Sequence, residues 1–428
     1  ASENHHSVRT QEIDGQQWTI TNGEPHRTGE GGDERERYLS IQGWTDERFV
    51  LRPQYYDWAT QDIFTVDDLP FIGRYRKDDA RIFTATGFKG WGMAHSMVAA
   101  RVISDAIQRK ENELKEKYDV AFRVTAIATG RHGRALDPQG IDLNRALELS
   151  AAGKNLNELS KTSSPDSIED FIVQSRADFL LENSPVNYEN GEPALTHIRC
   201  ALEHDMHAVS ANKGPVVHAY HELRKLAEQH HKKYLFESAV MDGAPVFSVF
   251  REALPAANLV AFEGVLNSCT NLLIELMEQG KSFDEAVAYA QSIGIAETDP
   301  SGDIDGWDAA IKVAAIVTVL MDTPYKPQQV ERQGIRGITQ AEIRQAQKDG
   351  SRWKLVCRGE KIGGRIVSKV APEMVTPQSP LYSVSGTSSF VLFKTDVLPG
   401  LGLLESNPSP DTTAYGLLAD VLNILKTE

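Results

Sequence analysis

The chain has 428 residues, enough for two or three domains, and 41% hydrophobic with 25% charged residues is typical of a soluble globular protein. The formal net charge of −15 argues against nucleic acid or an anionic membrane as a partner. Three cysteines without a CxxC pair, no apolar run of the ~20 residues that span a membrane, and no recognisable signal peptide predict a reducing, cytoplasmic location without disulfides or a zinc site.

The first 80 residues are polar and then rich in aromatic side chains, which predicts short strands joined by turns. Residues 24–107 resemble the C-terminal end of FAD-dependent oxidoreductases of the glycine and D-amino-acid oxidase type. The motifs that carry this resemblance are EPHRTG (24–29), WATQDIFTVDDLPFIG (58–73) and ARIFTATGFKGWGMAHSMVAARVISDAI (80–107). The half that binds the ADP part of FAD does not precede them. We therefore expect a fused fragment at 1–80 that binds no FAD.

The next segment, 81–110, has the pattern of a strand, a glycine-rich turn and a long helix. Gly87, Gly90 and Gly92 lie in the turn, as in the first βα unit of a dinucleotide-binding fold. The turn reads GFKGWG and not GxGxxG. Either this unit replaces a normal first βα unit, or it is a junction that weakens cofactor binding. Trp91 is bulky where the backbone must approach a pyrophosphate, which favours the second alternative.

Residues 122–129, FRVTAIAT, predict a strand, and the basic sequence RHGR follows it. Arg131 and its basic neighbours favour the 2′-phosphate of NADP, although a solvated basic loop is an equal alternative. Residues 177–185 predict a strand and turn, 194–205 a helix, and 206–215 a strand that ends in Lys213. Lys213 is thereby expected at a strand's carboxyl end, where ligands of open α/β sheets bind.

Residues 216–400 predict an α+β layer, a sheet with helices on one face. A sheet of this kind often packs on the sheet of a second subunit. The predicted strands are 234–250, 258–268, 353–364, 364–373 and 388–395, and the predicted helices are 271–279, 282–293, 306–321 and 339–350. A last helix over 413–425 is expected to return to the first domain.

The most informative stretch is 294–313, GIAETDPSGDIDGWDAAIKV. Pro300, Gly302 and Gly306 predict that its acidic part is a loop, and the spacing of apolar residues from Trp307 onward predicts a helix. Asp308 and Lys312 are four residues apart and so lie on one helix face. A carboxylate and an ammonium group side by side suit a site for a small zwitterion. The alternative is a capped helix with a surface ion pair worth only ~0.3–0.5 kcal/mol.

From about residue 111 to 428 the chain resembles homoserine dehydrogenases. The resemblance rests on the acidic stretch above and on seven further motifs, which follow one another in the same order as in that family. These are VTAIATGRHG (124–133), SANKGP (210–215), FESAVMDGAPVF (236–247), GVLNSCTNLLIELMEQGKSFDEAV (264–287), RGIT (336–339), GTSSFV (386–391) and TTAYGLLADVL (412–422).

This resemblance implies an α/β fold with a Rossmann-like NAD(P)-binding domain at 81–215 plus 401–428, and an α+β catalytic and dimerisation domain at 216–400. It implies NADPH- or NADH-dependent reduction of L-aspartate 4-semialdehyde to L-homoserine, a step of threonine and methionine biosynthesis, in a homodimer. The chain departs from the family pattern at four places. GFKGWG stands in place of the family's GFGxxG turn, Asp242 replaces a small residue, Cys269 stands where threonine is usual, and NPSPDTT replaces the glycine-rich turn before the last helix.

The resemblance also implies roles for individual residues. Lys312 is the expected proton donor, with a pKa lowered by burial, and Asp308 would hold it in place. The remaining roles are Lys213 near the reacting oxygen and the cofactor, Glu297 and Asp303 on the substrate's ammonium group, Ser184 on the nicotinamide side, and carbonyls of Glu237, Val240, Asp242 and Ala244 on a monovalent cation such as Na⁺.

Two other functions remain open from the sequence. The N-terminal resemblance allows a flavin-dependent amine oxidoreductase fragment. The altered glycine turn allows a chimera in which cofactor binding is impaired.

Overall fold

The computed structural model describes residues 113–426, except 119, 130, 131, 163, 164 and 298, together with four short strands before them. β1 (Ser7–Ile13) and β2 (Gln16–Asn22) form an antiparallel pair within one compact unit, Ala1–Val66. β3 (Phe71–Arg74) and β4 (Phe83–Thr86) form a second antiparallel pair, within the unit Asp67–Glu428. The strand expected at the start of 81–110 is therefore present as β4, but its partner is β3 and not a strand of a parallel sheet.

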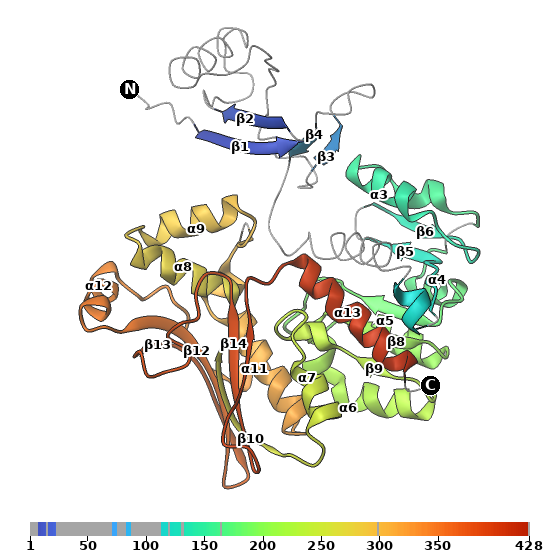
Figure 1. Ribbon diagram of the computed structural model, residues 1–428. Helices are drawn as coiled ribbons and strands as arrows, with labels where there is room; N and C mark the ends of the chain where they lie inside the picture. Colours follow the sequence, from blue (N-terminus) through green and yellow to red (C-terminus); the bar gives the residue numbers. More distant parts are fainter. Residues whose placement is uncertain are drawn as a thin grey trace. The chain divides into compact units, whose positions relative to one another are not determined.

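A three-stranded parallel sheet forms the centre of the first half of the larger unit. Its strands are β7 (Phe179–Glu182), β8 (His207–Ser210) and β9 (Tyr234–Leu235), in that order. α5 (Ala194–Glu203) and α6 (Lys213–Gln229) make the two crossovers. Both α5 and α13 (Pro410–Leu425) contact β8, and all four β8 residues are buried, as expected for a parallel strand covered on both faces. The expected return of the last helix to this sheet is thus present (Figure 1).

Three expectations for this half need correction. β9 extends the parallel sheet beyond residue 215, where we expected the domain to end. The strand expected over 122–129 is only β5 (Ala126–Ala128), and it pairs antiparallel with β6 (Arg134–Leu136), because Gly133 with φ of 73° turns the chain back on itself. Lys213 does not end a strand: it begins α6, whose N-cap is Asn212. The remaining helices here are α3 (Leu143–Ala151), η1 (Leu156–Leu159) and α4 (Ile168–Gln174).

The second half contains a six-stranded sheet in the order β11-β13-β12-β10-β14-β15. All neighbours are antiparallel except β11 and β13. The strands are β10 (Leu259–Val265), β11 (Glu331–Arg332), β12 (Arg352–Ile362), β13 (Arg365–Val375), β14 (Ser389–Thr395) and β15 (Leu401–Glu405). The helices are α8 (Ser268–Glu278), α9 (Phe283–Ser292), α10 (Ser301–Ile304), α11 (Trp307–Leu320) and α12 (Gln340–Lys348), with the turn η4 (Pro327–Gln329).

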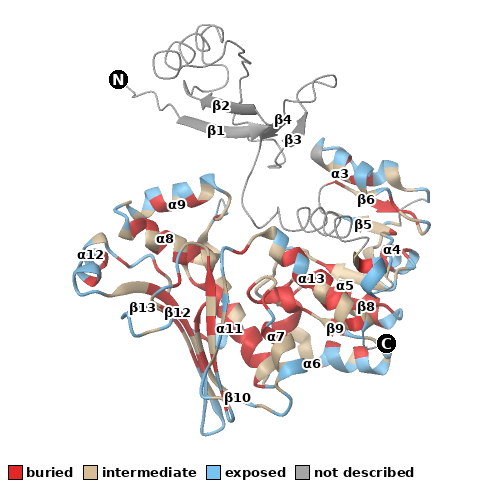
Figure 2. Cartoon of the chain, in the orientation of Figure 1, coloured by how far each residue is buried: buried red, intermediate tan, exposed pale blue. Residues whose placement is uncertain are grey.

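α11 is the helix on which both halves are built. It contacts α6 on one side and β12 and β13 on the other, so a single hydrophobic core runs through both halves. Nine of its residues, from Ala309 to Thr318, are buried (Figure 2). Gly306 precedes the first residue of α11 and has a left-handed backbone with φ of 81°. The sequence predicted that this glycine ends the acidic stretch and that the helix begins at Trp307. Among the described helices none is both long and apolar enough to cross a membrane.

Three expectations for the second half were wrong. The acidic part of 294–313, expected to be a loop, contains the short helix α10, which begins directly after Pro300. The strand expected over 234–250 is mostly helical turns: η2 (Glu237–Ala239), α7 (Val246–Ser248) and the π-helical η3 (Val249–Ala253) follow β9. The reason is local, because the Glu237 carboxylate accepts hydrogen bonds from the Phe247 and Ser248 amides and so caps a helical turn. Residues 401–405 belong to the six-stranded sheet as β15, and not to the first domain.

Candidate active site

The Asp308 carboxylate lies between two lysines at the start of α11. Its Oδ2 is 2.9 Å from Lys312 Nζ, one turn further along the helix, and its Oδ1 is 3.4 Å from Lys213 Nζ at the start of α6. The Asp308 and Lys312 side chains are only 14% and 15% exposed. Lys312 Nζ also donates to the Leu266 carbonyl at 2.7 Å. This partly buried arrangement, with two cations and a third partner, excludes the simple surface ion pair that the sequence left open.

Asn267 connects this pair to a second acid, and the sequence analysis did not single it out. Its Nδ2 donates to Asp303 Oδ1 at 2.6 Å and to Asp308 Oδ2 at 2.9 Å. Its Oδ1 accepts from the Thr270 amide at 2.8 Å, so Asn267 is also the N-cap of α8. The available signal was the motif NSCTN, in which an asparagine before a helix can cap that helix and still donate two hydrogens.

Electrostatics divide the roles of these groups. Burial raises the Asp308 pKa, but Lys312 and Lys213 lower it, and the net direction is downward, so Asp308 is ionised. Burial, and then the Asp308 charge, raises the pKa of Asp303. For Lys312 burial lowers the pKa, as we expected, but Asp308, Asp242 and Asp303 outweigh it and the net direction is upward. The expected lowering of the Lys312 pKa is therefore wrong, and the side chain is an ammonium group at neutral pH.

Glu297 and Cys269 complete the surroundings of Asp303. Glu297 is exposed as a whole residue, but its carboxyl group is partly shielded from water, and this shielding and the charges of Asp308 and Asp299 raise its pKa. The buried thiol of Cys269 hydrogen-bonds Asp303, and burial followed by the Asp303 charge raises its pKa, so it stays a neutral thiol. The structure thus brings Asp303, Asp308, Lys312 and Lys213 together and leaves Glu297 at the rim.

The loop after β7 has the features of a ligand site at a strand's carboxyl end. Ser184 Oγ, Asn183 Oδ1 and Glu182 Oε2 are buried without a hydrogen-bond partner. Buried polar atoms of this kind are normally satisfied, so three in consecutive residues indicate a missing polar partner. This fits a dinucleotide near the expected Ser184. The other expected contacts, Gly87, Gly90, Gly92 and Arg131, lie outside the described residues.

Arg134, one of the basic residues expected to favour NADP, has a structural role. Its guanidinium donates to the carbonyls of Pro165 at 3.0 Å and Asp166 at 2.9 Å and lies over the Phe171 ring. It is therefore not a free phosphate ligand.

The expected cation loop is tightly folded against the start of α13. Met241 and Asp242 have φ of 57° and 44°, a conformation that costs non-glycine residues energy. The Asp242 carboxylate accepts from Thr413 Oγ1 at 2.8 Å. Among the described residues no group of three or more His, Cys, Asp or Glu side chains is arranged to hold a metal. A cation here would accordingly depend on backbone carbonyls.

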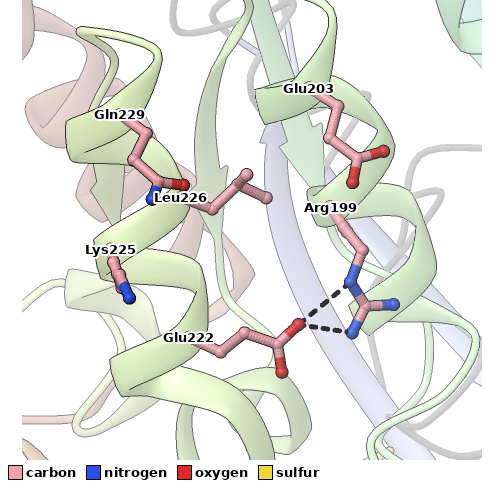
Figure 3. A pocket seen from close by; sticks show the side chains of 6 residues that line it. All are labelled: Arg199, Glu203, Glu222, Lys225, Leu226 and Gln229. Atoms are coloured by element: carbon pink, nitrogen blue, oxygen red, sulfur yellow. Dashed lines mark hydrogen bonds and ion pairs between the residues drawn. The ribbon is translucent and has the colours of Figure 1, made fainter.

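A shallow pocket lies between α5 and α6, separate from these groups. It is lined by Leu226 and five charged or polar side chains, and Arg199 donates two hydrogen bonds to Glu222 (Figure 3). None of the acid or lysine groups at α11 lines it.

A parallel strand–helix unit with unsatisfied polar groups at its carboxyl end, next to a cluster of acids and lysines, is the arrangement expected of a dinucleotide-dependent oxidoreductase. Comparison with known families agrees. Residues 98–237 match the family model "Homoserine dehydrogenase, NAD binding domain", and residues 245–422 match "Homoserine dehydrogenase". The chain belongs to the homoserine dehydrogenase family.

Individual relatives match this chain over most of their own length. The homoserine dehydrogenase of Methanocaldococcus jannaschii is 34% identical over 324 residues, which cover 75% of this chain and 94% of that protein. The NAD(+)-dependent homoserine dehydrogenase of Pseudomonas canavaninivorans is 29% identical, over 76% of this chain and 92% of its own length. The fold is that of the solved homoserine dehydrogenases from Thermoplasma acidophilum and Thiobacillus denitrificans. Their TM-scores are 0.66 and 0.64 at 23% and 24% identity, covering 78% of this chain in both cases and 97% and 72% of those chains.

The family match begins at residue 98, before the position near 111 that the motifs predicted. Residues 1–97 lie outside both matches. The resemblance of 24–107 to FAD-dependent oxidoreductases gains no support from these comparisons and stays a prediction from motifs.

Proposed function

We propose that this chain interconverts L-aspartate 4-semialdehyde and L-homoserine with a nicotinamide dinucleotide, and that Lys312 is the proton donor. The observation that carries the proposal is the Asp308 carboxylate held between Lys312 and Lys213, and linked through Asn267 to Asp303. Two carboxyl and two ammonium groups around one point suit a small substrate that carries both an ammonium group and a carbonyl.

Of the two lysines, Lys312 is a stronger candidate than Lys213 for the group that donates a proton to the substrate oxygen. In the reducing direction the aldehyde carbon gains a hydride and its oxygen gains a proton, and this yields the primary alcohol. The nicotinamide, when bound, supplies the hydride. The neighbouring carboxylates raise the Lys312 pKa and keep it protonated. Asp308 and the Leu266 carbonyl fix two of its hydrogen-bonding directions, which leaves the third for the substrate oxygen.

Asp303 and Glu297 would hold the substrate's ammonium group. Both carboxyl groups have raised pKa values because burial and neighbouring acids disfavour their charges, and a bound ammonium group would relieve that repulsion. Lys213 would neutralise Asp308 and lie near the reacting oxygen.

Ser184 would contact the nicotinamide end of the cofactor, since its buried hydroxyl has no partner in the described chain. A preference for NADP now depends on Arg131, because Arg134 is bound to two backbone carbonyls. The turn with Gly87, Gly90 and Gly92 would approach the pyrophosphate. A monovalent cation would be held by carbonyls of Glu237, Val240, Asp242 and Ala244, where the left-handed backbone at Asp242 reorients the peptide groups.

A homodimer would form through the sheet face opposite α11. Ile362, Val367 and Leu404 on this face are more than half exposed, at 54%, 56% and 60%. Apolar side chains in such an exposed position favour burial against a second copy. A monomeric mass in solution would contradict this part of the proposal.

The three cysteines are buried and unpaired, which supports a cytoplasmic location.

The experiment is a homoserine-dependent reduction of NAD⁺ and of NADP⁺ by the whole chain, followed through the nicotinamide absorbance. The proposal expects turnover with L-homoserine and a kcat/KM ratio that identifies the preferred dinucleotide. A parallel titration of the chain with each reduced dinucleotide separates the alternative of a chimera with an impaired cofactor site. Tight dinucleotide binding without homoserine turnover would contradict the proposed function, and absence of both would favour the impaired chimera.

A further inference from the structure

The loop between β7 and α5 brings Tyr188 from the first half of the chain to the acids of α10 and α11. Its main-chain carbonyl accepts from His218 Nε2 at 3.1 Å and from Gln328 Nε2 at 3.5 Å. The loop also packs on the start of α6, where a Cβ on Gly214 would lie 2.9 Å from Gly191 Cα. Tyr188 is thereby fixed on the same helix start that presents Lys213.

The ring of Tyr188 packs on the large core, and its hydroxyl points toward α10. A Cβ on Gly302 would be 3.5 Å from this oxygen, and Asp303 is the next residue. Within the part of the chain that the structure describes, this hydroxyl makes no hydrogen bond to another residue. A half-buried phenol that makes no hydrogen bond within the described chain can donate its hydrogen to a ligand.

Electrostatics keep this phenol protonated. Burial, and then the charges of Asp308, Asp303 and Glu297, raises the Tyr188 pKa well above its usual range. A neutral phenol can donate one hydrogen bond to a carboxylate, and the nearby carboxylates are stronger acceptors than its oxygen for the substrate's ammonium group.

The substrate of the proposed reaction has three polar groups, and the cluster at α11 accounts for two of them. Asp303 and Glu297 suit the ammonium group, and Lys312 suits the oxygen that is reduced. Because Lys213 is paired with Asp308, the α-carboxylate has no donor assigned to it among these groups. We propose that the Tyr188 hydroxyl donates a hydrogen bond to the α-carboxylate of the substrate and so selects α-amino acids. This inference rests on the proposed function and adds a residue for substrate selection to it.

Three competitive ligands, each lacking one group of homoserine, test the assignment with Tyr188→Phe. L-2-Aminobutanoate keeps the ammonium and carboxylate groups, 4-hydroxybutanoate lacks the ammonium group, and 3-aminopropan-1-ol lacks the carboxylate. A hydrogen bond to a charged group is worth ~1.5–3 kcal/mol, so the inhibition constants of the first two ligands should rise about 10- to 100-fold in the variant. The constant for 3-aminopropan-1-ol should not change. Tyr289→Phe, which alters an exposed tyrosine on α9, is the control and should change none of them.

Several outcomes would overturn the inference. Equal constants for both chains with all three ligands would mean that the hydroxyl touches no ligand. A rise confined to the two ligands with an ammonium group would assign the hydroxyl to that group, and an equal rise for all three would indicate general damage to the site. If the unaltered chain does not oxidise homoserine, the proposed function fails separately. Calorimetric binding of L-2-aminobutanoate and 3-aminopropan-1-ol to both chains still decides whether Tyr188 binds a carboxylate.

Discussion

Lys354 is a buried charge that the proposed reaction does not use. It is 1% exposed in β12, and its Nζ donates to Asn271 Oδ1 at 2.7 Å and to the Val384 carbonyl. Asn271 lies one turn beyond Asn267 on α8 and also donates to the Gly386 carbonyl at 2.9 Å. Lys354 therefore connects α8 to the loop after β13. Asn267, at the start of α8, donates hydrogen bonds to Asp303 and Asp308. Burial lowers its pKa to about 8.

This lowered pKa predicts a specific pH dependence of stability. The unfolded chain keeps the lysine protonated up to its ordinary pKa of about 10.4, whereas the folded chain releases the proton near 8. Between these values the unfolded state binds more protons, so the free energy of unfolding rises with pH. Relative to Lys354→Met, the unaltered chain should gain up to about 3 kcal/mol between neutral pH and about pH 10 in urea unfolding. Lys361→Met, at an exposed site in the same strand, should run parallel to the unaltered chain, and parallel curves for Lys354→Met would refute the argument.

At the scale of elements, the segment between β11 and α12 holds α10 in place. The Ile335 amide donates to the Ile304 carbonyl at 2.9 Å, and Arg336 Nε lies 2.5 Å from Asp305 Oδ1. A Cβ on Gly334 would collide with the Ile304 carbonyl and come within 2.6 Å of Asp305 Cα. This close backbone approach requires a glycine.

Gly334→Ala should therefore displace α10, which carries Asp303. We expect a KM for homoserine raised about tenfold and a stability loss of about 1–3 kcal/mol, the usual cost of overpacking. Gly337→Ala is a matched control three residues away, because no heavy atom lies within 4 Å of its added Cβ. Steady-state kinetics and thermal unfolding of both variants check the prediction. Equal behaviour of the two would show that α10 does not depend on this contact.

The sequence predicts elements well where one period dominates. The apolar spacing after Trp307 gives α11, and the long runs that form β12, β13 and β14 were assigned correctly. The apolar run at 234–250 has no such guide, because a side chain at Glu237 converts it into capped turns. β15 was missed because it is short and contains Gly402, which packs on the Phe390 ring.

The site divides in the same way. Spacing alone predicts the Asp308–Lys312 pair. No local pattern places Lys213 beside Asp308, since that contact depends on α6 packing on α11. The sequence assigned Lys213 to a ligand site through a strand end that the structure does not have, and the family resemblance placed it near the reacting oxygen. The bridging role of Asn267 and the approach of Tyr188 to α10 are tertiary features, visible only in the folded chain.

At the scale of the whole molecule, the two family-matched halves are joined by one core in which α11 contacts elements of both. The lysines on α6 and α11 can meet across Asp308 only while this packing is intact. The acid–base cluster thus depends on the packing of α6 on α11, and the proposed function requires both halves.

The most direct test of the account is the proton donor itself. Lys312→Ala should lower kcat by about 10²–10⁴, the usual value of a positioned acid, while the dissociation constant of the reduced dinucleotide stays nearly unchanged. Lys348→Ala, at an exposed position on α12, is the control. Because the carboxylates raise the Lys312 pKa, the unaltered chain should reduce the aldehyde well at neutral pH. Its oxidation of homoserine should become faster as the pH rises and Lys312 loses its proton. The Lys312→Ala variant should not show this pH dependence. A variant that keeps its turnover rate but loses dinucleotide affinity would contradict the account.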